Sequence, residues 1–453
     1  MYRTTCHRTP GAIACLVALA SLGIVACRRP EAELTADDLR RLADLPGISK
    51  SADDRLKSEL ARIRKEEATP RQLNRVDAAR LPDGLHPTPD TRERSTKALT
   101  EWLTDGMVRQ YQAKLARWYR DVLAGIPIDD RPVVKTLLKE TREFRGNARK
   151  LIGQRDFGLA VAIDRGPFAD MRFLDRAELF VQLESIDALS RLLDDEPVNA
   201  VVRWDLAGRM IEEIASLPHG VPRAAAARLR SNWLRVGQTI AERSASAPDV
   251  LDSIEATLNR HLQRWPEDRL ALIGDRAVGL ITYELLRTGY WMSLLPITEL
   301  QKLKQDNRLG KMAVYLQERV DDDEWYYLRT MRKLIDVSGK PYYERRATIE
   351  AIDKEQDELR GTVDFPWYAT DYLLQDVDQL QRLQALDRTL TEGLLFAIAT
   401  AKDPQAPGRP PRIQETGDAV RYRIDEKNVV LENLEWPEDR TPVTVPIVTR
   451  RPR

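Results

Sequence analysis

Cysteine is scarce in this chain of 453 residues, and its positions limit the available chemistry. The three cysteines are Cys6, Cys15 and Cys27, and none follows them. The chain after Cys27 therefore has no free thiol, no disulfide and no cysteine metal site. Such a chain avoids stray disulfides in an oxidising compartment.

Histidine is almost as rare. Beyond His7 the chain holds His86, His219 and His261, and none has a partner at metal-ligand spacing. His219 falls in a Pro-His-Gly turn, and the pattern around His261 predicts a place on a helix surface. The HExxH, GxSxG and GxGxxG motifs, the P-loop and the EF-hand loop are missing as well. We therefore expect no metal and no cofactor.

An excess of charge of one sign is also missing, because 71 lysines and arginines balance 71 aspartates and glutamates. A nucleic-acid-binding domain usually carries a strongly basic face, so no nucleic-acid partner is expected. With 31% charged and 42% hydrophobic residues, the composition is that of a folded protein. The length allows two or three domains.

The longest apolar run is Gly11 to Ala26, near the N-terminus. It is too short to cross a bilayer comfortably, since a spanning helix needs roughly 20 apolar residues. Arg3 and Arg8 precede it, and no acidic residue occurs before Glu31. This arrangement is typical of a secretory signal peptide.

Cys27 ends the segment IVAC, residues 24–27, which resembles the lipobox of bacterial lipoproteins. The resemblance implies cleavage before Cys27 and acyl chains on its sulfur and its new amino group, which together make a stable anchor. Arg28 stands where many lipoproteins of the inner membrane have aspartate. By that analogy we expect a cell-envelope protein at the periplasmic face of the outer membrane. The alternatives are a retained N-terminal anchor and a plain signal peptide with a chance cysteine.

We divide the chain into a signal peptide (1–26), a tether with short helices (27–89), a helical domain (90–403) and a C-terminal linker with a β-hairpin (404–453). In the helical domain nearly every apolar run repeats at helical spacing, as in "FLDRAELFVQLESIDALSRLLDDE", and prolines separate the runs. In the tail, "AVRYRI" and "VVLENL" alternate around the turn "DEKN", and "TPVTVPIVT" can add an edge strand. The predicted fold is mainly α, an irregular bundle or array of helices with a small C-terminal β element.

A regular helical repeat is the alternative within that fold class. "WDLAGRMI", residues 204–211, is similar to the first helix of a tetratricopeptide repeat. The second-helix positions do not follow, and no 34-residue period recurs. We therefore favour the irregular array.

Glu284 is the carboxylate that most needs explanation. On a helical wheel of roughly 100° per residue it falls inside the apolar stripe of its helix, with Arg276 and Arg287 along the edge. A carboxylate on such a face must be paired, or its pKa rises. We expect a buried ion pair among these three residues. The alternative is a general acid, for instance in glycan cleavage.

The same helix contains "GDRAVGLITYELLR", residues 274–287. This stretch resembles a segment of a loosely defined group of exported helical proteins of unknown function. In that group a G-[DE]-R-A-x-G-[LM] helix accompanies a short β-rich tail. The resemblance implies no activity.

The acidic run from Asp321 to Glu324 precedes "WYYLRTMRKLI". Acidic side chains stabilise a helix N-terminus, so we expect the run to cap and charge the start of that helix. Attraction of a cation is the alternative.

Aromatic residues gather in one part of the chain, since nine of the 13 tyrosines lie between Tyr283 and Tyr372. Such side chains are favoured at protein interfaces and on sugar-stacking surfaces, and they also fill cores. The candidate interaction face consists of Tyr290, Trp291, Trp325, Tyr326, Tyr327, Trp367 and Tyr368.

These observations lead to a lipid-anchored scaffold of the cell envelope, which binds the membrane through Cys27 and presents a helical surface to an envelope protein or a glycan. A peptidoglycan- or glycan-acting hydrolase using Glu284 is the alternative. A third possibility, a carrier of an apolar ligand, requires a large internal cavity.

Overall fold

The computed structural model describes residues 89–123, 131–287, 291–295, 297–362, 365–375, 377–437 and 440–448. The predicted signal peptide, Cys27, His86 and the two predicted tether helices lie outside these residues, and so does Tyr290. Helices make up most of the described chain, and three strands follow them near the C-terminus. The predicted fold class, mainly α with a small C-terminal β element, is confirmed.

The elements follow one another along the chain with short connections. The helices are α5 (Pro89–Glu101), α6 (Asp105–Leu123), α7 (Arg131–Glu140), α8 (Arg142–Ile152), η1 (Ile163–Phe168), α9 (Arg172–Leu193), α10 (Pro197–Ala215), α11 (Gly220–Arg243), α12 (Pro248–Gln263), α13 (Asp268–Arg287), α14 (Trp291–Leu294), α15 (Ile297–Gln305), α16 (Leu309–Val337), α17 (Tyr342–Leu359), η2 (Ala369–Leu373) and α18 (Val377–Lys402). The strands are β1 (Tyr422–Ile424), β2 (Asn428–Glu435) and β3 (Pro442–Pro446).

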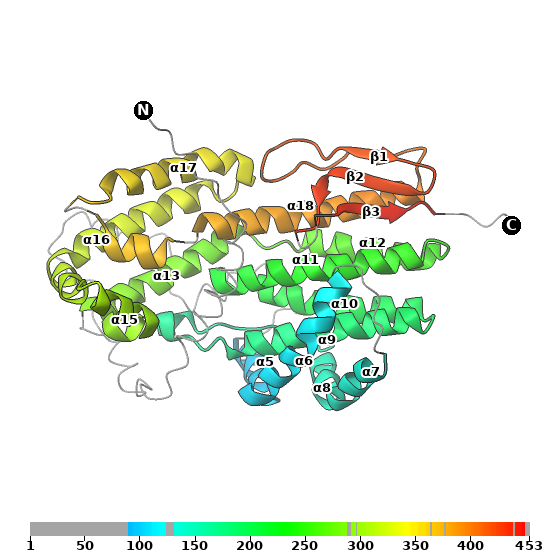
Figure 1. Ribbon diagram of the computed structural model, residues 1–453, viewed down its shortest axis with the longest axis horizontal. Helices are drawn as coiled ribbons and strands as arrows, with labels where there is room; N and C mark the ends of the chain where they lie inside the picture. The colour runs from blue at the N-terminus through cyan, green and yellow to red at the C-terminus, as the bar shows by residue number, and fades with distance from the viewer. Residues whose placement is uncertain are drawn as a thin grey trace.

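Helices α9, α10, α11 and α18 lie side by side along the long axis of the molecule (Figure 1). Helix α9 packs against α10, α10 against α11, and α11 against α18. Helices α13, α16 and α17 form one end of the molecule, while the sheet lies at the other end on α18 (Figure 1). Helices α5 to α8 cover α9 on the side away from the sheet.

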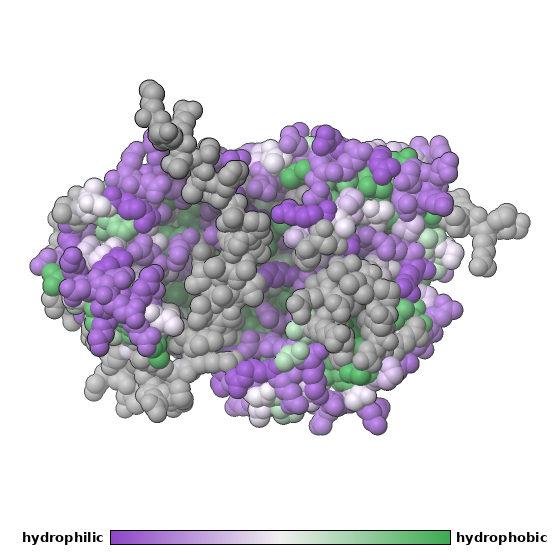
Figure 2. Space-filling model, viewed as in Figure 1, coloured by the Kyte–Doolittle hydropathy of each residue, from purple (hydrophilic) through white to green (hydrophobic). Residues whose placement is uncertain are grey.

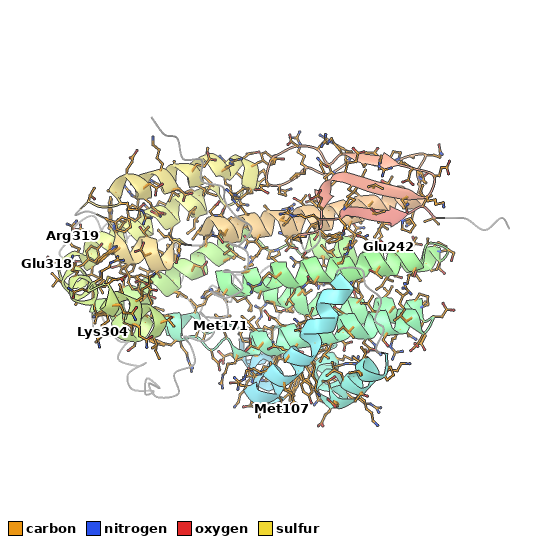
Figure 3. All side chains as sticks on the ribbon, in the orientation of Figure 1. Met107, Met171, Glu242, Lys304, Glu318 and Arg319 are labelled. Atoms are coloured by element: carbon orange, nitrogen blue, oxygen red, sulfur yellow. The ribbon has the colours of Figure 1, made fainter. Side chains whose placement is uncertain are left out.

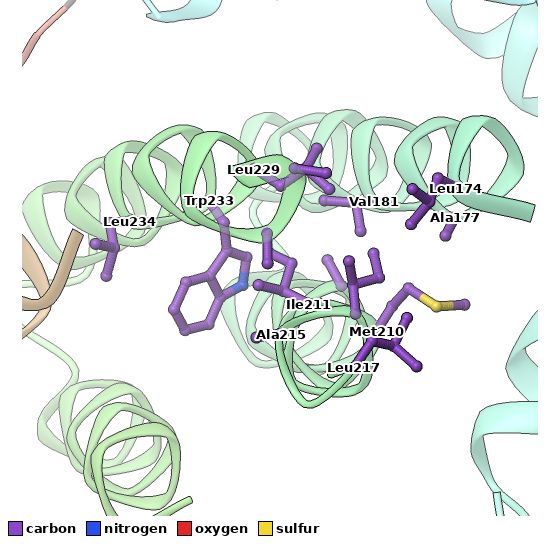
Figure 4. Packing of buried hydrophobic residues seen from close by; sticks show 14 of the residues in the cluster. Leu174, Ala177, Val181, Met210, Ile211, Ala215, Leu217, Leu229, Trp233 and Leu234 are labelled. Atoms are coloured by element: carbon purple, nitrogen blue, oxygen red, sulfur yellow. The ribbon is translucent and has the colours of Figure 1, made fainter. Parts of the chain in front are cut away.

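The core runs between α9, α10 and α11. Helix α9 is buried on almost every side, and its buried residues include the charged Arg176, Glu184 and Asp187 as well as many apolar ones. Figure 4 shows Val181 of α9 and Met210 of α10 facing each other, with Leu229 of α11 beside them. These side chains are all buried, and removal of such apolar area from water is the main force that holds the helices together.

Two tryptophans and two glycines fix the crossing of α10 and α11. Trp204 and Trp233 stack with ring centroids 4.1 Å apart and planes 4° apart. Each indole Nε1 donates to the backbone oxygen of the other tryptophan at 2.7 Å. Trp233 lies against Gly208, and Trp204 lies against Gly237, where a Cβ atom would meet the ring at under 3 Å. Each helix thus carries a W-x-x-x-G pair, and the glycine of each pair lies against the tryptophan of the other helix.

The strands form an antiparallel sheet in the order β1-β2-β3. The predicted hairpin is confirmed, with Ile424 paired with Val429, and the predicted edge strand is β3. Asp425 Oδ1 accepts hydrogen bonds from the backbone N–H groups of Lys427 (2.9 Å) and Asn428 (2.6 Å), which holds the turn. One face of the sheet packs on α18 and α11, so the sheet and the helices share one core.

The face seen in Figure 2 is mostly hydrophilic, with hydrophobic side chains in small groups between polar ones. Charged residues such as Lys304, Glu318 and Arg319 lie at the end of the molecule away from the sheet (Figure 3). Among the described residues, no helix combines the length and apolar character that a membrane span requires.

Candidate functional site

Glu284 lies on α13 beside α16, and its side chain is 19% exposed. Arg287 Nη1 donates to Glu284 Oε1 at 3.1 Å, which is the i,i+3 pair that the sequence predicts. The same guanidinium donates from Nη2 to Asp321 Oδ1 at 2.6 Å and to Glu324. One arginine of α13 therefore holds three carboxylates, two of them on α16.

Arg276, the other predicted partner, lies about two turns before Glu284 and is buried. Burial raises the pKa of the Tyr327 hydroxyl, and the positive charge of the Arg276 guanidinium opposes that shift. The structure thus places Arg276 and Arg287 in different surroundings along α13.

The acidic run from Asp321 to Glu324 lies in the middle of α16, so the prediction that it starts a helix is wrong. The helical periodicity of the sequence before the acidic run continues through the run without a break. The run therefore lies inside the helix and does not begin it. Asp321 and Glu324 are on the side that meets Arg287.

Asp323 does cap a helix, but a different one. Its carboxylate accepts hydrogen bonds from the backbone N–H groups of Tyr368 (2.9 Å) and Ala369 (2.8 Å), at the start of the segment that leads into the π-helix η2. The hydroxyls of Tyr283 (2.5 Å) and Tyr315 (2.6 Å) also donate to it. With four donors the buried carboxylate is well satisfied, although burial raises its pKa.

The pKa of Glu324 suits a general acid, but its side chain is not accessible to a substrate. Burial raises its pKa to about 7, and the attraction of Arg287 opposes the shift. A pKa near neutrality suits proton transfer. The side chain, however, has no exposed surface, and no substrate reaches it in this conformation.

The Gly-Asp-Arg stretch of α13 is a close helix contact. A Cβ atom at Gly274 would lie 1.6 Å from the backbone oxygen of Pro218, so only glycine fits. Asp275 Oδ1 accepts the backbone N–H of Gly220 at 2.8 Å, at the start of α11. Tyr327 occupies the space left by Gly279, and its hydroxyl donates to the backbone oxygen of Asp275 at 2.9 Å. These contacts join α13 to α16, to the start of α11 and to the loop before it.

The candidate aromatic face needs correction at three positions. Tyr326, Tyr327 and Tyr368 are buried, with at most 4% of their surface exposed, so they fill the core of this end and present no surface to a partner. The half-buried members are Trp291, Trp325 and Trp367. The sequence did not predict which aromatic residues are exposed, because consecutive residues of a helix point in different directions around its axis. Packing then decides which of them are covered.

The histidines lie apart from this region. His219 is the N-cap of α11, and its Nδ1 lies 3.1 Å from Asp275 Oδ1. His261 is buried against Trp233, with ring centroids 4.4 Å apart, so the prediction of a surface position is wrong. In the part of the chain that the structure describes, no three histidine or acidic side chains are grouped to hold a metal ion.

A second charged cluster, which the sequence analysis did not predict, lies between α8, α9 and α10. Glu184 and Asp187 of α9 are buried there and are contacted by arginines of all three helices. The signal that could have revealed it is the i,i+3 spacing of these two acids among the apolar residues Leu183, Ile186 and Ala188.

Two cavities lined by described residues lie away from Glu284. One is an open groove of about 470 Å³ along α7 and α8, and the other is a small, partly enclosed space of about 10 Å³ beside Asp387 and Trp265. No protein-family model, curated protein or solved structure matches this chain.

Proposed function

We propose that this protein is a lipid-anchored helical scaffold of the bacterial cell envelope. The lipobox-like segment at residues 24–27 supports the anchor, and Arg28 supports the outer membrane as its location. The body would then present its helices to an envelope protein or a glycan in the periplasm.

The observation that carries the scaffold role is the network around Arg287. The carboxylate of Glu284 is held at 3.1 Å by Arg287, which also holds Asp321 and Glu324 on α16. A partly buried arginine with three carboxylates ties α13 to α16, and removal of one member leaves the others without their partner. This arrangement supports a rigid surface.

Hydrolysis of a glycan has less support. It needs two carboxylates that face a substrate, one as acid and one as base or nucleophile. Glu284 is committed to Arg287, and Glu324 has no exposed surface. A ligand carrier has no more support, because of these two cavities one is an open groove and the other is too small for a ligand.

The test combines two readouts in growing cells. With labelled fatty acid, the wild type and Cys6→Ala should both carry the label, and Cys27→Ala should lose it, because Cys27 supplies the acylated sulfur and amino group. Label retained in Cys27→Ala would contradict the anchor.

The second readout tests the scaffold. A photo-crosslinking amino acid replaces Met292, which is 50% exposed beside Trp291, or, as a control, Lys354 on the charged surface of α17. A defined envelope protein joined through position 292 alone, and lost in Cys27→Ala, is the expected result. Crosslinks to glycan strands alone would favour a glycan ligand, and equal capture at both positions would contradict a specific face.

A further inference from the structure

Two carboxylates of α9 form the centre of the cluster between α8, α9 and α10. The Glu184 side chain has no exposed surface, and that of Asp187 is 7% exposed. Buried charges of this kind must be paired, because their removal from water is unfavourable. They lie three residues apart and therefore share one face of α9.

Four arginines converge on Asp187. Arg145 Nη2 and Arg149 Nη2 of α8 lie 2.6 Å and 2.9 Å from Oδ2. Arg203 Nε of α10 lies 3.5 Å from the same oxygen, and Arg191 Nε of α9 lies 3.4 Å from Oδ1. The four guanidinium groups therefore surround one carboxylate, and Arg145 and Arg149 also bond Glu184.

Positive charge exceeds negative charge in this cluster. Four guanidinium groups meet the two buried carboxylates, and the exposed Glu196 adds one more through Arg191 at 2.6 Å. Arg145 Nη1 has no hydrogen-bond acceptor in the described structure, and Arg191 Nε and Arg203 Nε, at 3.4 Å and 3.5 Å from the Asp187 carboxylate, contact it without an aligned hydrogen bond. Arg145 is only 6% exposed, and a buried donor without an acceptor is unfavourable.

The arginines also act on one another. Burial lowers the pKa of Arg203, and the charges of Arg149 and Arg191 add to that shift, while Glu184 and Asp187 oppose it. Burial likewise lowers the pKa of Arg145, against the attraction of Glu184 and Asp187, and the charge of Arg149 lowers it further. An added negative charge at this point would relieve that repulsion.

We propose that Arg149, Arg191 and Arg203 bind a phosphate group, either free inorganic phosphate or the headgroup of a phospholipid. Their side chains are 24%, 33% and 23% exposed, so solvent reaches part of each. A guanidinium presents a planar fork of donors that matches a tetrahedral oxyanion. Arg145 is the buried member, and it holds the two carboxylates in place below the site. This site does not depend on the proposed scaffold role.

The experiment uses the mature-length chain with Cys27→Ala, so that no acyl chain contributes to lipid binding. Calorimetry with inorganic phosphate at constant ionic strength should show one site and a raised unfolding temperature. Arg203→Gln should weaken phosphate binding about tenfold or more, because it removes a charge-assisted donor pair. Arg203→Lys keeps the charge but loses the planar fork of donors. Its affinity for phosphate should lie between those of the wild type and Arg203→Gln.

Arg209→Gln is the matched control, since Arg209 lies on the same helix, is 47% exposed and pairs with Asp205 outside the cluster. Its phosphate affinity should equal that of the wild type. Equal binding by every variant, or phosphate effects reproduced by chloride, would overturn the proposal.

Vesicles of phosphatidylethanolamine with phosphatidylglycerol distinguish the two sources. Cosedimentation that depends on Arg203 and is released by phosphate assigns a lipid headgroup. Phosphate binding without cosedimentation assigns free phosphate. Failure of the wild type to bind either probe contradicts the site.

Discussion

His261 illustrates, at the scale of single residues, how this core holds a polar group. The ring lies on Trp233, and its Nε2 is 3.1 Å from Oε1 of Glu212, in a contact that is not aligned as a hydrogen bond. Burial lowers the pKa of His261 well below its ordinary value, and the charges of Arg230, Arg260 and Arg264 lower it further. The folded protein therefore keeps this imidazole neutral where the unfolded chain protonates it.

This pKa shift predicts a pH dependence of stability. Below about pH 6.5 the unfolded state binds a proton that the folded state does not, so the free energy of unfolding falls as the pH falls, by up to about 1.4 kcal/mol per pH unit. Above that pH the contribution is complete. Urea unfolding between pH 5 and 8 should therefore show a weaker acid loss for His261→Gln than for the wild type.

Other buried groups change the stability with pH in the opposite direction, so the effect of His261 appears only when the variants are compared. Burial raises the pKa values of Glu324 and Asp387 to about 7, so stability that comes from their protonated forms is lost as the pH rises from about 4.5 to 7. Trp233→Phe is the control, since it loosens the same pocket at every pH and should keep the slope of the wild type. An unchanged slope in His261→Gln would contradict the assignment.

At the scale of elements, glycines decide where the helices of this protein approach most closely. Gly208 and Gly237 admit tryptophans between α10 and α11, and Gly274 admits the backbone of the loop before α11. Gly393 of α18 leaves room for Leu434 of the sheet. Glycine destabilises a helix interior, so its presence at these contacts indicates that the gain from close packing outweighs its low helix propensity.

Gly274→Ala should destabilise the protein by about 3 kcal/mol or more, because the new Cβ atom meets a backbone oxygen that cannot turn aside. Gly146→Ala on α8 is the control: nothing lies within 4 Å of a Cβ atom there. It should stabilise by about 0.5–1 kcal/mol through helix propensity. Thermal and urea unfolding measure both, and equal effects of the two substitutions would refute the contact.

At the scale of the whole molecule, the sheet is part of the same packed body as the helices. Trp436, which follows β2, is fully buried, and its indole Nε1 donates to Gln238 Oε1 of α11 at 2.7 Å. After β3, the N–H of Val448 donates to the backbone oxygen of Ala401 at the end of α18, at 3.0 Å. The sheet and the helices should therefore unfold together.

Trp436→Ala should lower the free energy of unfolding by about 3–5 kcal/mol, since it leaves a large cavity and removes the donor to Gln238 Oε1. The loss should appear in the helical circular-dichroism signal even though the substitution lies in the sheet region. Arg423→Ala, at an exposed position of β1, should change the stability by less than about 0.5 kcal/mol. A helical transition unmoved by Trp436→Ala would show that the sheet is an independent unit.

The class of fold and the local structure follow from the sequence alone. The 3.6-residue periodicity and the prolines predicted the helices, and the alternation around Asp425 predicted the hairpin. The pair of Glu284 and Arg287 also followed from spacing, because both residues lie on one helix. These features depend on neighbours within a few positions, which a sequence displays directly.

The packing of the helices, in contrast, brings distant residues together. It placed His261 in the core, turned Asp323 toward the segment that leads into η2, and covered Tyr326. It also gathered arginines from three helices around Asp187. Such contacts depend on how whole helix faces pack together, and because one helix can present a polar residue to solvent or to another helix with the same periodicity, no local pattern distinguishes the two.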